Sequence, residues 1–309
     1  MQTKPRALML LGPTACGKTA LSLSLAKRLP VEIISVDSAL VYRGMDIGSA
    51  KPSLREREGV PHHLIDILEI EESYSAAAFA ADAERLIGES HARGRYPLLV
   101  GGTMLYAKAL REGMDESPVT DPAVRARVTA EGEALGWPAM HEKLSQVDPV
   151  TAARLAPNDK QRIGRALEVF EVTGKPLSSL HTGQKAYDPT IAVAALFPQE
   201  RSKLHEMIGK RFDAMLQNGL LDEMRALMAR PGFDEALPSM RAVGYRQAID
   251  YLKGRCTYEA FVEAGKAATR QLAKRQITWL RSMPGVVTVD PYAMALDDIE
   301  AQLLHLIGA

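Results

Sequence analysis

The sequence predicts an α/β protein with a parallel sheet of the P-loop NTPase type, flanked by helices and carrying an inserted all-helical subdomain. Short apolar runs alternate with helical patterns, a glycine-bounded loop joins the first run to the first helix, and strand patterns are absent between 113 and 190. Such alternation is typical of parallel sheets that helices cover on both faces. We expect a catalytic core over 1–112 and 191–309, and a helical insertion over 113–190.

The first predicted strand, over 7–11, runs directly into the pattern of a phosphate-binding loop, G-x-x-x-x-G-K-[ST]. The glycines let several backbone N–H groups point into one concavity, and the following helix terminus and a lysine add positive charge. We therefore predict a polyphosphate site, with the Thr19 hydroxyl placed to reach a Mg²⁺ ion on the phosphates. The loop consists of Gly12, Pro13, Thr14, Ala15, Cys16, Gly17, Lys18 and Thr19.

A carboxylate follows the second predicted strand, which covers 31–36 and ends at Asp37. Ligands of open α/β sheets bind outside the carboxyl ends of the strands, so Asp37 should face the same crevice as the phosphate loop. A carboxylate there can accept a proton or hold a magnesium ion. An aspartate that only caps the next turn would give the same pattern.

Two more strands are predicted, over 60–68 and 96–100, and the second ends in Gly101, Gly102 and Thr103. Many P-loop NTPases carry an acidic residue here that organises magnesium and water. Two glycines and a hydroxyl instead indicate a site that binds rather than one that activates water. His62 and His63 are adjacent on a predicted strand and point to opposite faces, so we do not expect them to share a metal ion.

The remaining core elements are predicted as a strand over 191–197, a helix over 200–229 with a break at Asn218 and Gly219, and helices within 241–281. This last tract has nine basic and three acidic residues, in a chain whose formal net charge is +0. Local clustering of positive charge indicates a polyanionic partner. An exposed basic helix that merely faces solvent is the alternative.

The composition narrows the class of protein. Two cysteines exclude a disulfide framework and a cysteine-rich zinc site. No apolar run approaches the roughly 18 residues that a membrane span requires. We therefore expect a cytoplasmic protein, most simply a monomer, without a membrane partner.

Taken together, six segments resemble successive signatures of bacterial tRNA dimethylallyltransferases, and they follow the same order. These segments are 12–19, 35–38, 42–52, 100–103, 162–168 and 241–246. The resemblance implies transfer of a dimethylallyl group from dimethylallyl diphosphate to N6 of the adenosine immediately 3′ of the anticodon, with release of diphosphate. It implies Mg²⁺ as cofactor, Asp37 as general base, and Thr103 as a second catalytic residue that contacts the target nucleotide or the donor.

The resemblance also implies a surface that binds the tRNA anticodon stem-loop and receives a flipped-out base. Its residues would be Asp37, Ser38, Ala39, Leu40, Thr103, Arg125, Gln161, Arg162, Ile163, Gly164, Arg165, Arg241, Ala242, Val243, Gly244, Tyr245, Arg246, Lys274, Arg275, Gln276, Ile277, Thr278, Trp279, Leu280 and Arg281. Eukaryotic relatives add a zinc finger at the C-terminal end, which two cysteines cannot build here.

Two other classes of function compete with this interpretation. A P-loop kinase of a nucleoside or small metabolite would use Asp37 as the hydroxyl base but would leave the basic tract over 241–281 without a role. A non-catalytic RNA-binding module gated by a nucleotide would explain that tract but not Asp37 beside the phosphate loop. Binding of dimethylallyl diphosphate without ATP hydrolysis separates the prenyltransferase from both.

Overall fold

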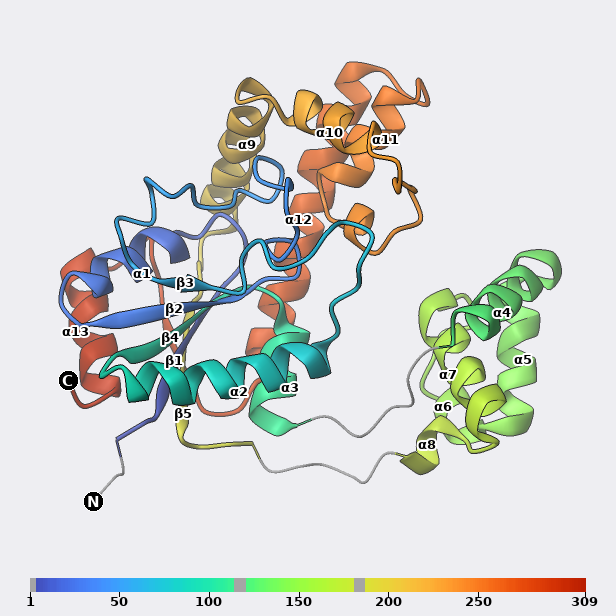
Figure 1. Ribbon diagram of the computed structural model, residues 1–309, viewed down its shortest axis with the longest axis horizontal. Coiled ribbons are helices and arrows are strands. Elements are labelled where there is room, and N and C mark those ends of the chain that lie inside the picture. Colours follow the sequence, from blue (N-terminus) through green and yellow to red (C-terminus); the bar gives the residue numbers. More distant parts are fainter. Residues whose placement is uncertain (1–3, 114–120, 181–186) are drawn as a thin grey trace. The chain divides into compact units, whose positions relative to one another are not determined.

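The computed structural model describes residues 4–113, 121–180 and 187–309, which fall into two compact units (Figure 1). The first unit takes in the described residues up to Glu112 and from Tyr187 onward, and the second takes in those between Gly113 and Ala186. Residues 187–190, expected in the insertion, group with the first unit. The Arg6 guanidinium donates to the Asp188 carboxylate over 2.7 Å, which attaches this segment beside the sheet.

A parallel sheet forms the centre of the first unit and confirms the predicted α/β fold. Its six strands, counted over the described residues, have the order β3-β2-β4-β1-β5-β6, and every pairing is parallel. The strands are β1 (Ala7–Leu11), β2 (Val31–Val36), β3 (His62–His63), β4 (Tyr96–Gly101), β5 (Ile191–Leu196) and β6 (Val286–Val289). The loops after β1, β2 and β4 therefore emerge side by side at one edge.

Helices cover both faces of this sheet, as the apolar strands require. Successive residues of a strand point to opposite faces, so Met9 joins one core cluster with α2, α3 and the end of α12, while Leu8 and Leu10 join another with α1 and α13. The helices of the first unit are α1 (Lys18–Ala26), α2 (Ala76–Ala92), α3 (Met104–Glu112), α9 (Arg201–Gln217), α10 (Leu220–Met228), α11 (Tyr245–Leu252), α12 (Tyr258–Ser282) and α13 (Leu296–Leu306).

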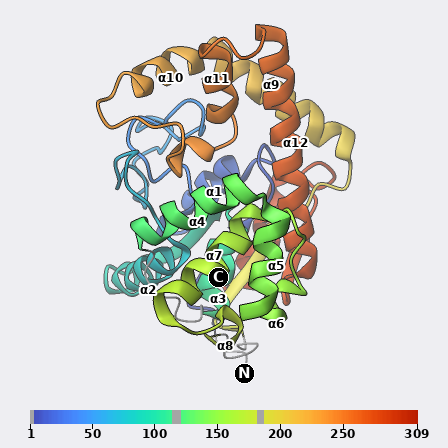
Figure 2. The same ribbon diagram turned by 90° about the vertical axis from the view of Figure 1, so that its right-hand side faces the viewer.

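A third cluster joins α9, α10, α11 and α12 to the loops that follow β2. These helices lie side by side in both views (Figures 1 and 2). Phe212, Met224 and Phe261 pack there against Val41 and Ile70. The helical layer thus forms a wall beside the carboxyl ends of the strands. The predicted break in the helix over 200–229 is confirmed, because Gly219 lies at φ 99° between α9 and α10.

One predicted boundary is wrong, and two elements were missed. The strand expected over 60–68 consists of His62–His63 alone, because Leu64 and Asp66 adopt left-handed backbone angles, with φ of 61° and 57°, that end strand pairing. The sheet also has a strand, β6, and a final helix, α13, that were not predicted.

Over the described residues 121–180 of the second unit, the regular secondary structure is all helical. The helices are α4 (Pro122–Leu135), α5 (Trp137–Val147), α6 (Pro149–Ala152), α7 (Lys160–Thr173) and α8 (Leu177–Leu180). They enclose a small apolar core of their own, to which Val128, Leu144 and Ile163 belong. Across both units, none of the described helices combines the length and apolar character needed to cross a membrane.

Candidate active site

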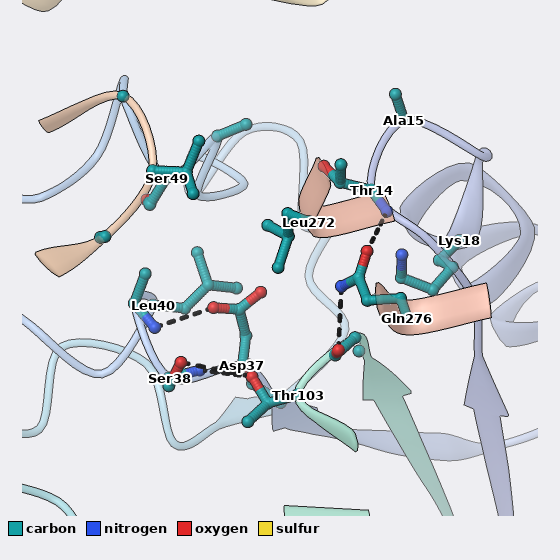
Figure 3. Close-up of a pocket in the computed structure, with 18 of the residues that line it drawn as sticks. Thr14, Ala15, Lys18, Asp37, Ser38, Leu40, Ser49, Thr103, Leu272 and Gln276 are labelled. Atoms are coloured by element: carbon teal, nitrogen blue, oxygen red, sulfur yellow. Dashed lines mark hydrogen bonds between the residues drawn. The ribbon is translucent and has the colours of Figure 1, made fainter. Parts of the chain in front are cut away.

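A cleft of about 720 Å³ opens in the first unit, at the carboxyl ends of β1, β2 and β4. The phosphate loop, the segment after β2 and the turn after β4 form one side of it. Residues of α9 and α12 and of the 238–245 segment form the other. Figure 3 shows Asp37, Thr103 and Gln276 among the residues that line it. The structure thus brings together three segments that the sequence singled out separately.

The phosphate loop is folded tightly against the sheet. A Cβ on Gly12 would lie 2.8 Å from the Cys16 sulfur and 3.0 Å from the carbonyl oxygen of Leu196, so a side chain has no room there. Gly17 adopts a left-handed φ of 91° that favours glycine. The Lys18 ammonium donates to the carbonyl oxygens of Gly12 and Pro13, over 3.0 Å and 2.7 Å. These contacts hold a positive charge inside the curve of the loop.

Only part of the loop can reach a ligand through side chains. Thr14, Lys18 and Thr19 line the cleft, and Thr19 lies exposed in the first turn of α1. Cys16 is 2% exposed and packs into the core cluster with β1 and β5. Burial raises the pKa of its thiol. Cys16 can therefore serve a bound anion through its backbone N–H but not as a reactive thiolate.

Asp37 projects from the end of β2 into the cleft (Figure 3). One carboxylate oxygen, Oδ1, accepts a hydrogen bond from the backbone N–H of Ala39 over 2.8 Å. The turn-capping role that the sequence allowed is thus real, and it uses one oxygen. It fixes the direction of the side chain, so that the second oxygen is presented to the cleft.

The turn after β4 places Thr103 beside this aspartate. A Cβ on Gly101 would lie 2.1 Å from the Val36 carbonyl oxygen, so only glycine lets β4 run this close to β2. The Thr103 hydroxyl accepts from the backbone N–H of Ser38 over 3.0 Å and donates to the Ser38 hydroxyl over 3.3 Å. Thr103 is therefore hydrogen-bonded to Ser38, the residue that directly follows Asp37.

Arg211, on α9, is a functional candidate that the sequence analysis missed. Its side chain lines the cleft, and its Nη2 donates to the carbonyl oxygen of Ser49 over 3.4 Å. Burial lowers the pKa of the guanidinium, and the nearby Asp37 carboxylate opposes this effect. The sequence does contain a pattern that could have identified it. Leu204, Ile208 and Phe212 form the apolar face of α9, and an arginine on that face needs a polar environment.

Glu223, on α10, was also missed. Its carboxylate accepts hydrogen bonds from three successive backbone N–H groups, those of Asp46, Ile47 and Gly48, over 2.9, 2.7 and 3.1 Å. The Tyr245 hydroxyl donates to the same carboxylate over 2.6 Å. Glu223 thereby holds the glycine-punctuated loop over 42–52 against the helical wall of the cleft.

The segment over 241–246 divides into exposed and buried positions. Arg241 and Arg246 are exposed, and Ala242 and Val243 line the cleft. Gly244 is buried at the start of α11, and Tyr245 lies entirely in the third core cluster apart from its hydroxyl contacts. The buried pair can shape the cleft wall, whereas the two arginines are available to a partner.

Helix α12 shows the same division. Lys274, Arg275, Thr278, Trp279 and Arg281 are exposed, and the Trp279 side chain is 38% exposed at the rim of the cleft. Ile277 is half-buried and Leu280 belongs to the core.

Gln276, also on α12, turns inward. It is 8% exposed and hydrogen-bonds the phosphate loop and the turn after β4. Its side chain is thus directed at other protein groups rather than at a partner, whereas the exposed residues of α12 form a surface.

The candidates of the second unit lie on α4 and α7. Gln161 and Arg162 are exposed, and Arg162 pairs with Asp159 over 3.1 Å. Arg125 donates to Glu168 over 3.2 Å, and Arg165 lies 3.6 Å from the same carboxylate. Two further candidates, Ile163 and Gly164, are buried in the helical core, so they support the helix rather than present a side chain.

Metal binding by protein side chains alone finds no support among the described residues, since no three histidine, cysteine or acidic side chains gather there. His63 instead hydrogen-bonds Glu32 over 2.9 Å, and His62 bonds the carbonyl oxygen of Val60 over 2.8 Å. Both histidines therefore have structural partners.

Comparison of the sequence with known proteins identifies close relatives. A sequence model described as IPP transferase matches residues 40–283. The tRNA dimethylallyltransferase of Thiobacillus denitrificans is 55% identical over 306 residues, which cover 99% of this chain and 97% of the relative. That of Burkholderia lata is 57% identical over 304 residues, covering 95% of this chain and 94% of the relative.

Solved structures give the same result. The full-length tRNA isopentenylpyrophosphate transferase of Bacillus halodurans superimposes with a TM-score of 0.71 at 39% identity, covering 99% of this chain and 97% of that one. A eukaryotic dimethylallyltransferase acting on tRNA gives a TM-score of 0.80 at 27% identity, covering 97% of this chain and 77% of that one.

The fold and the cleft define an α/β protein of the P-loop type, in which the glycine-bounded loop after β1 and a carboxylate share one site. With nearly full-length relatives at this level of identity, the chain belongs to the tRNA dimethylallyltransferase family. It is an enzyme, and it transfers a dimethylallyl group to adenosine in tRNA.

Proposed function

We propose that the enzyme transfers the dimethylallyl group of dimethylallyl diphosphate to N6 of the adenosine immediately 3′ of the anticodon. N6 attacks C1 of the donor, the C1–O bond breaks, and diphosphate leaves with the bonding electrons. The observation that carries this proposal is a phosphate loop that shares its cleft with Asp37, while β4 ends in Gly101, followed by Gly102, instead of a water-activating acid.

The leaving diphosphate would be held by the loop. Backbone N–H groups and the start of α1 favour an anion there. Lys18 and Arg211 add two positive charges that line the same cleft. Groups already oriented toward developing negative charge stabilise a transition state more than mobile water does. The two cations would therefore stabilise the negative charge that develops on the diphosphate as the C1–O bond breaks.

Asp37 would act as general base. The N6 amino group is a weak nucleophile because its lone pair is delocalised into the purine ring. A carboxylate that accepts the N6 proton contributes typically about 10²- to 10⁴-fold to the rate. The cap from Ala39 to Oδ1 supports this role, since it orients the side chain and leaves Oδ2 for the proton. Thr103, bonded to Ser38, would contact the acceptor base or the donor beside it.

The residues present are compatible with a Mg²⁺ ion bound together with the donor. Mg²⁺ prefers oxygen ligands and is commonly held by one or two protein oxygens plus substrate phosphates and water. Thr19 offers a hydroxyl at the start of α1, beside the loop. We propose that Thr19 holds the ion, which would neutralise diphosphate charge when bound.

The tRNA would be bound mainly by exposed residues of α12 and of the second unit. Lys274, Arg275 and Arg281 supply positive charge and Trp279 a stacking face, a combination suited to unpaired RNA bases. In the second unit, the exposed Gln161 and Arg162, with Arg125 and Arg165, are the corresponding candidates. The anticodon stem-loop is the proposed contact region.

We further propose that the enzyme works as a monomer in the cytoplasm. All the residues that line the cleft belong to the first unit. The tRNA substrate supports a cytoplasmic location.

The test is incubation of the protein with Mg²⁺, isotopically labelled dimethylallyl diphosphate and unmodified tRNA, followed by mass analysis of the digested nucleosides. We expect one adenosine heavier by a dimethylallyl group, at the position 3′ of the anticodon. Label at another position, or no labelled adenosine at all, would contradict the proposal.

Asp37→Asn provides the residue-level prediction, because it keeps the size of the side chain and removes the base. We expect turnover to fall by about 10²- to 10⁴-fold while donor and tRNA affinities stay within a few-fold of wild type. Rapid-quench turnover and equilibrium binding would measure the two effects. A variant with normal turnover would remove Asp37 from proton transfer.

A further inference from the structure

We infer that Gln276 is a positioning residue that sets the phosphate loop against the turn carrying Thr103, rather than a residue that contacts tRNA. The inference builds on the proposed function, because it assumes that the loop holds the diphosphate donor. Gln276 lies on α12 between the exposed Arg275 and Thr278, so its sequence position alone suggests a tRNA contact.

The side chain makes two hydrogen bonds to backbone groups of different segments (Figure 3). Its Oε1 accepts from the Thr14 N–H over 2.9 Å, and its Nε2 donates to the Gly102 carbonyl oxygen over 2.9 Å. A carboxamide presents an acceptor and a donor on one rigid plane. It can therefore join an N–H group of one segment to a carbonyl of the other, which a carboxylate or an apolar side chain cannot do.

The sequence of the turn makes room for this connection. A Cβ on Gly102 would lie 2.4 Å from the Gln276 nitrogen and 3.2 Å from the Gly12 carbonyl oxygen. The glycine thus serves close packing of three segments, those that carry Gly12, Gly102 and Gln276. The bond from Gln276 to Gly102 is buried, so loss of the amide would leave the Gly102 carbonyl oxygen without this partner in a buried place.

The two segments that Gln276 connects would contact different reacting groups, the leaving diphosphate and the acceptor base. The loop holds the leaving diphosphate, and the turn leads to Thr103, whose hydroxyl bonds Ser38 next to Asp37. The Thr14 N–H that Gln276 engages also belongs to the loop that would otherwise offer it to the anion. Gln276 therefore selects which loop N–H groups face the donor, and it sets how far the donor lies from the base.

Loss of the Gln276 hydrogen bonds would let the phosphate loop shift relative to the turn that carries Thr103. We expect such a shift to affect turnover more than folding. A misplacement of about 1 Å between reacting groups can cost about 10²-fold in rate. We expect Gln276→Ala to lower kcat by about 10- to 100-fold and to raise the KM for dimethylallyl diphosphate several-fold. The Kd for tRNA should stay within about two-fold of wild type, because the side chain faces away from the proposed tRNA surface.

Gln276→Glu adds a second measurement, the pH dependence of activity, which should not change if Gln276 only stabilises the fold. The ionised carboxyl can accept from the Thr14 N–H but cannot donate to the Gly102 carbonyl oxygen, whereas the protonated carboxyl can do both. The activity of this variant, taken as a ratio to wild type at each pH, should therefore rise as the pH falls. Gln271→Ala, at an exposed position of the same helix, is the matched control and should behave as wild type.

The experiment measures kcat, donor KM, tRNA Kd and melting temperature for wild type and these three variants. A Gln276→Ala protein with weaker tRNA binding and unchanged donor KM would overturn the inference, and so would two Gln276 variants that match Gln271→Ala. Titration with inorganic diphosphate separates the inference from the proposed function. If wild type prenylates no tRNA, the proposed function fails, while an equal diphosphate affinity of wild type and Gln276→Ala would still refute the loop connection.

Discussion

Arg211 and Asp37 bring opposite charges into one cleft from different layers of the molecule. Asp37 ends a strand, and Arg211 comes from a helix of the wall. Burial lowers the pKa of the arginine, and the Asp37 carboxylate opposes this effect. A bound diphosphate would supply further negative charge there. At the residue scale, Arg211 is thus the main addition that the structure makes to the predicted site.

Arg211→Gln tests this addition. A hydrogen bond to a charged group is worth about 1.5–3 kcal/mol, which corresponds to about 10- to 100-fold in affinity. We expect the KM for dimethylallyl diphosphate and the Kd for inorganic diphosphate to rise by that factor, measured by steady-state kinetics and calorimetry. Lys210→Gln, at the exposed neighbouring position paired with Glu206, is the control and should leave both constants unchanged. Equal diphosphate affinities for wild type and Arg211→Gln would show that Arg211 does not bind the leaving group.

At the scale of elements, carboxylates of low exposure connect loops, helices and strands that are distant in the sequence. Glu223 joins three N–H groups of the 46–48 loop to α10. Glu32, on β2, accepts hydrogen bonds from Arg93 and Ser90 at the end of α2 and contacts His63 of β3. Hydrogen bonds, above all from Arg93, lower the pKa of Glu32 to about 2 despite its burial. The ionised form is therefore part of the fold.

Glu32→Gln should destabilise the protein in a pH-dependent way. A pKa below the ordinary value of 4.5 means that this carboxylate stabilises the fold above pH 4.5, and that the contribution is lost as the pH falls toward 2. We expect a loss of about 1–3 kcal/mol in the free energy of unfolding at pH 7. Partial exposure of Arg93 reduces the Coulombic share.

Urea unfolding of wild type and Glu32→Gln between pH 7 and pH 3 measures this effect. The difference between the two proteins should shrink below pH 4.5. Glu235→Gln is the control, since Glu235 pairs with Arg255 and Lys253 at the surface and its loss should change stability little. A difference for Glu32→Gln that stays constant down to pH 3 would contradict the assignment.

The sequence predicted local features well and partners that meet only in the folded chain poorly. The phosphate loop and the position of Asp37 follow from adjacent residues, because a strand, a tight turn and a helix define them. Arg211 and Glu223 were missed because their partners lie over 150 positions earlier in the chain. The strand over 60–68 was predicted too long because backbone angles at Leu64, rather than hydrophobicity, end it.

At the scale of the whole molecule, a net charge of +0 requires that tRNA be attracted by local surfaces. Lys274 and Arg275 are adjacent and exposed on α12. Replacing both with glutamine should weaken tRNA binding and reduce the slope of log Kd against log salt concentration by about 1 to 2, because each phosphate contact contributes about 0.7–0.9. Binding measured from low to high salt checks this. An unchanged slope would mean that these charges merely face solvent.

The central claim is that a phosphate-binding loop here holds a leaving group instead of transferring phosphate. Dimethylallyl diphosphate labelled with ¹⁸O at the bridge between C1 and phosphorus tests it most directly. We predict one labelled diphosphate released for each prenylated adenosine formed, because the C1–O bond breaks and the oxygen stays on phosphorus. Released orthophosphate, or diphosphate without the label, would show that another bond breaks and would contradict the account.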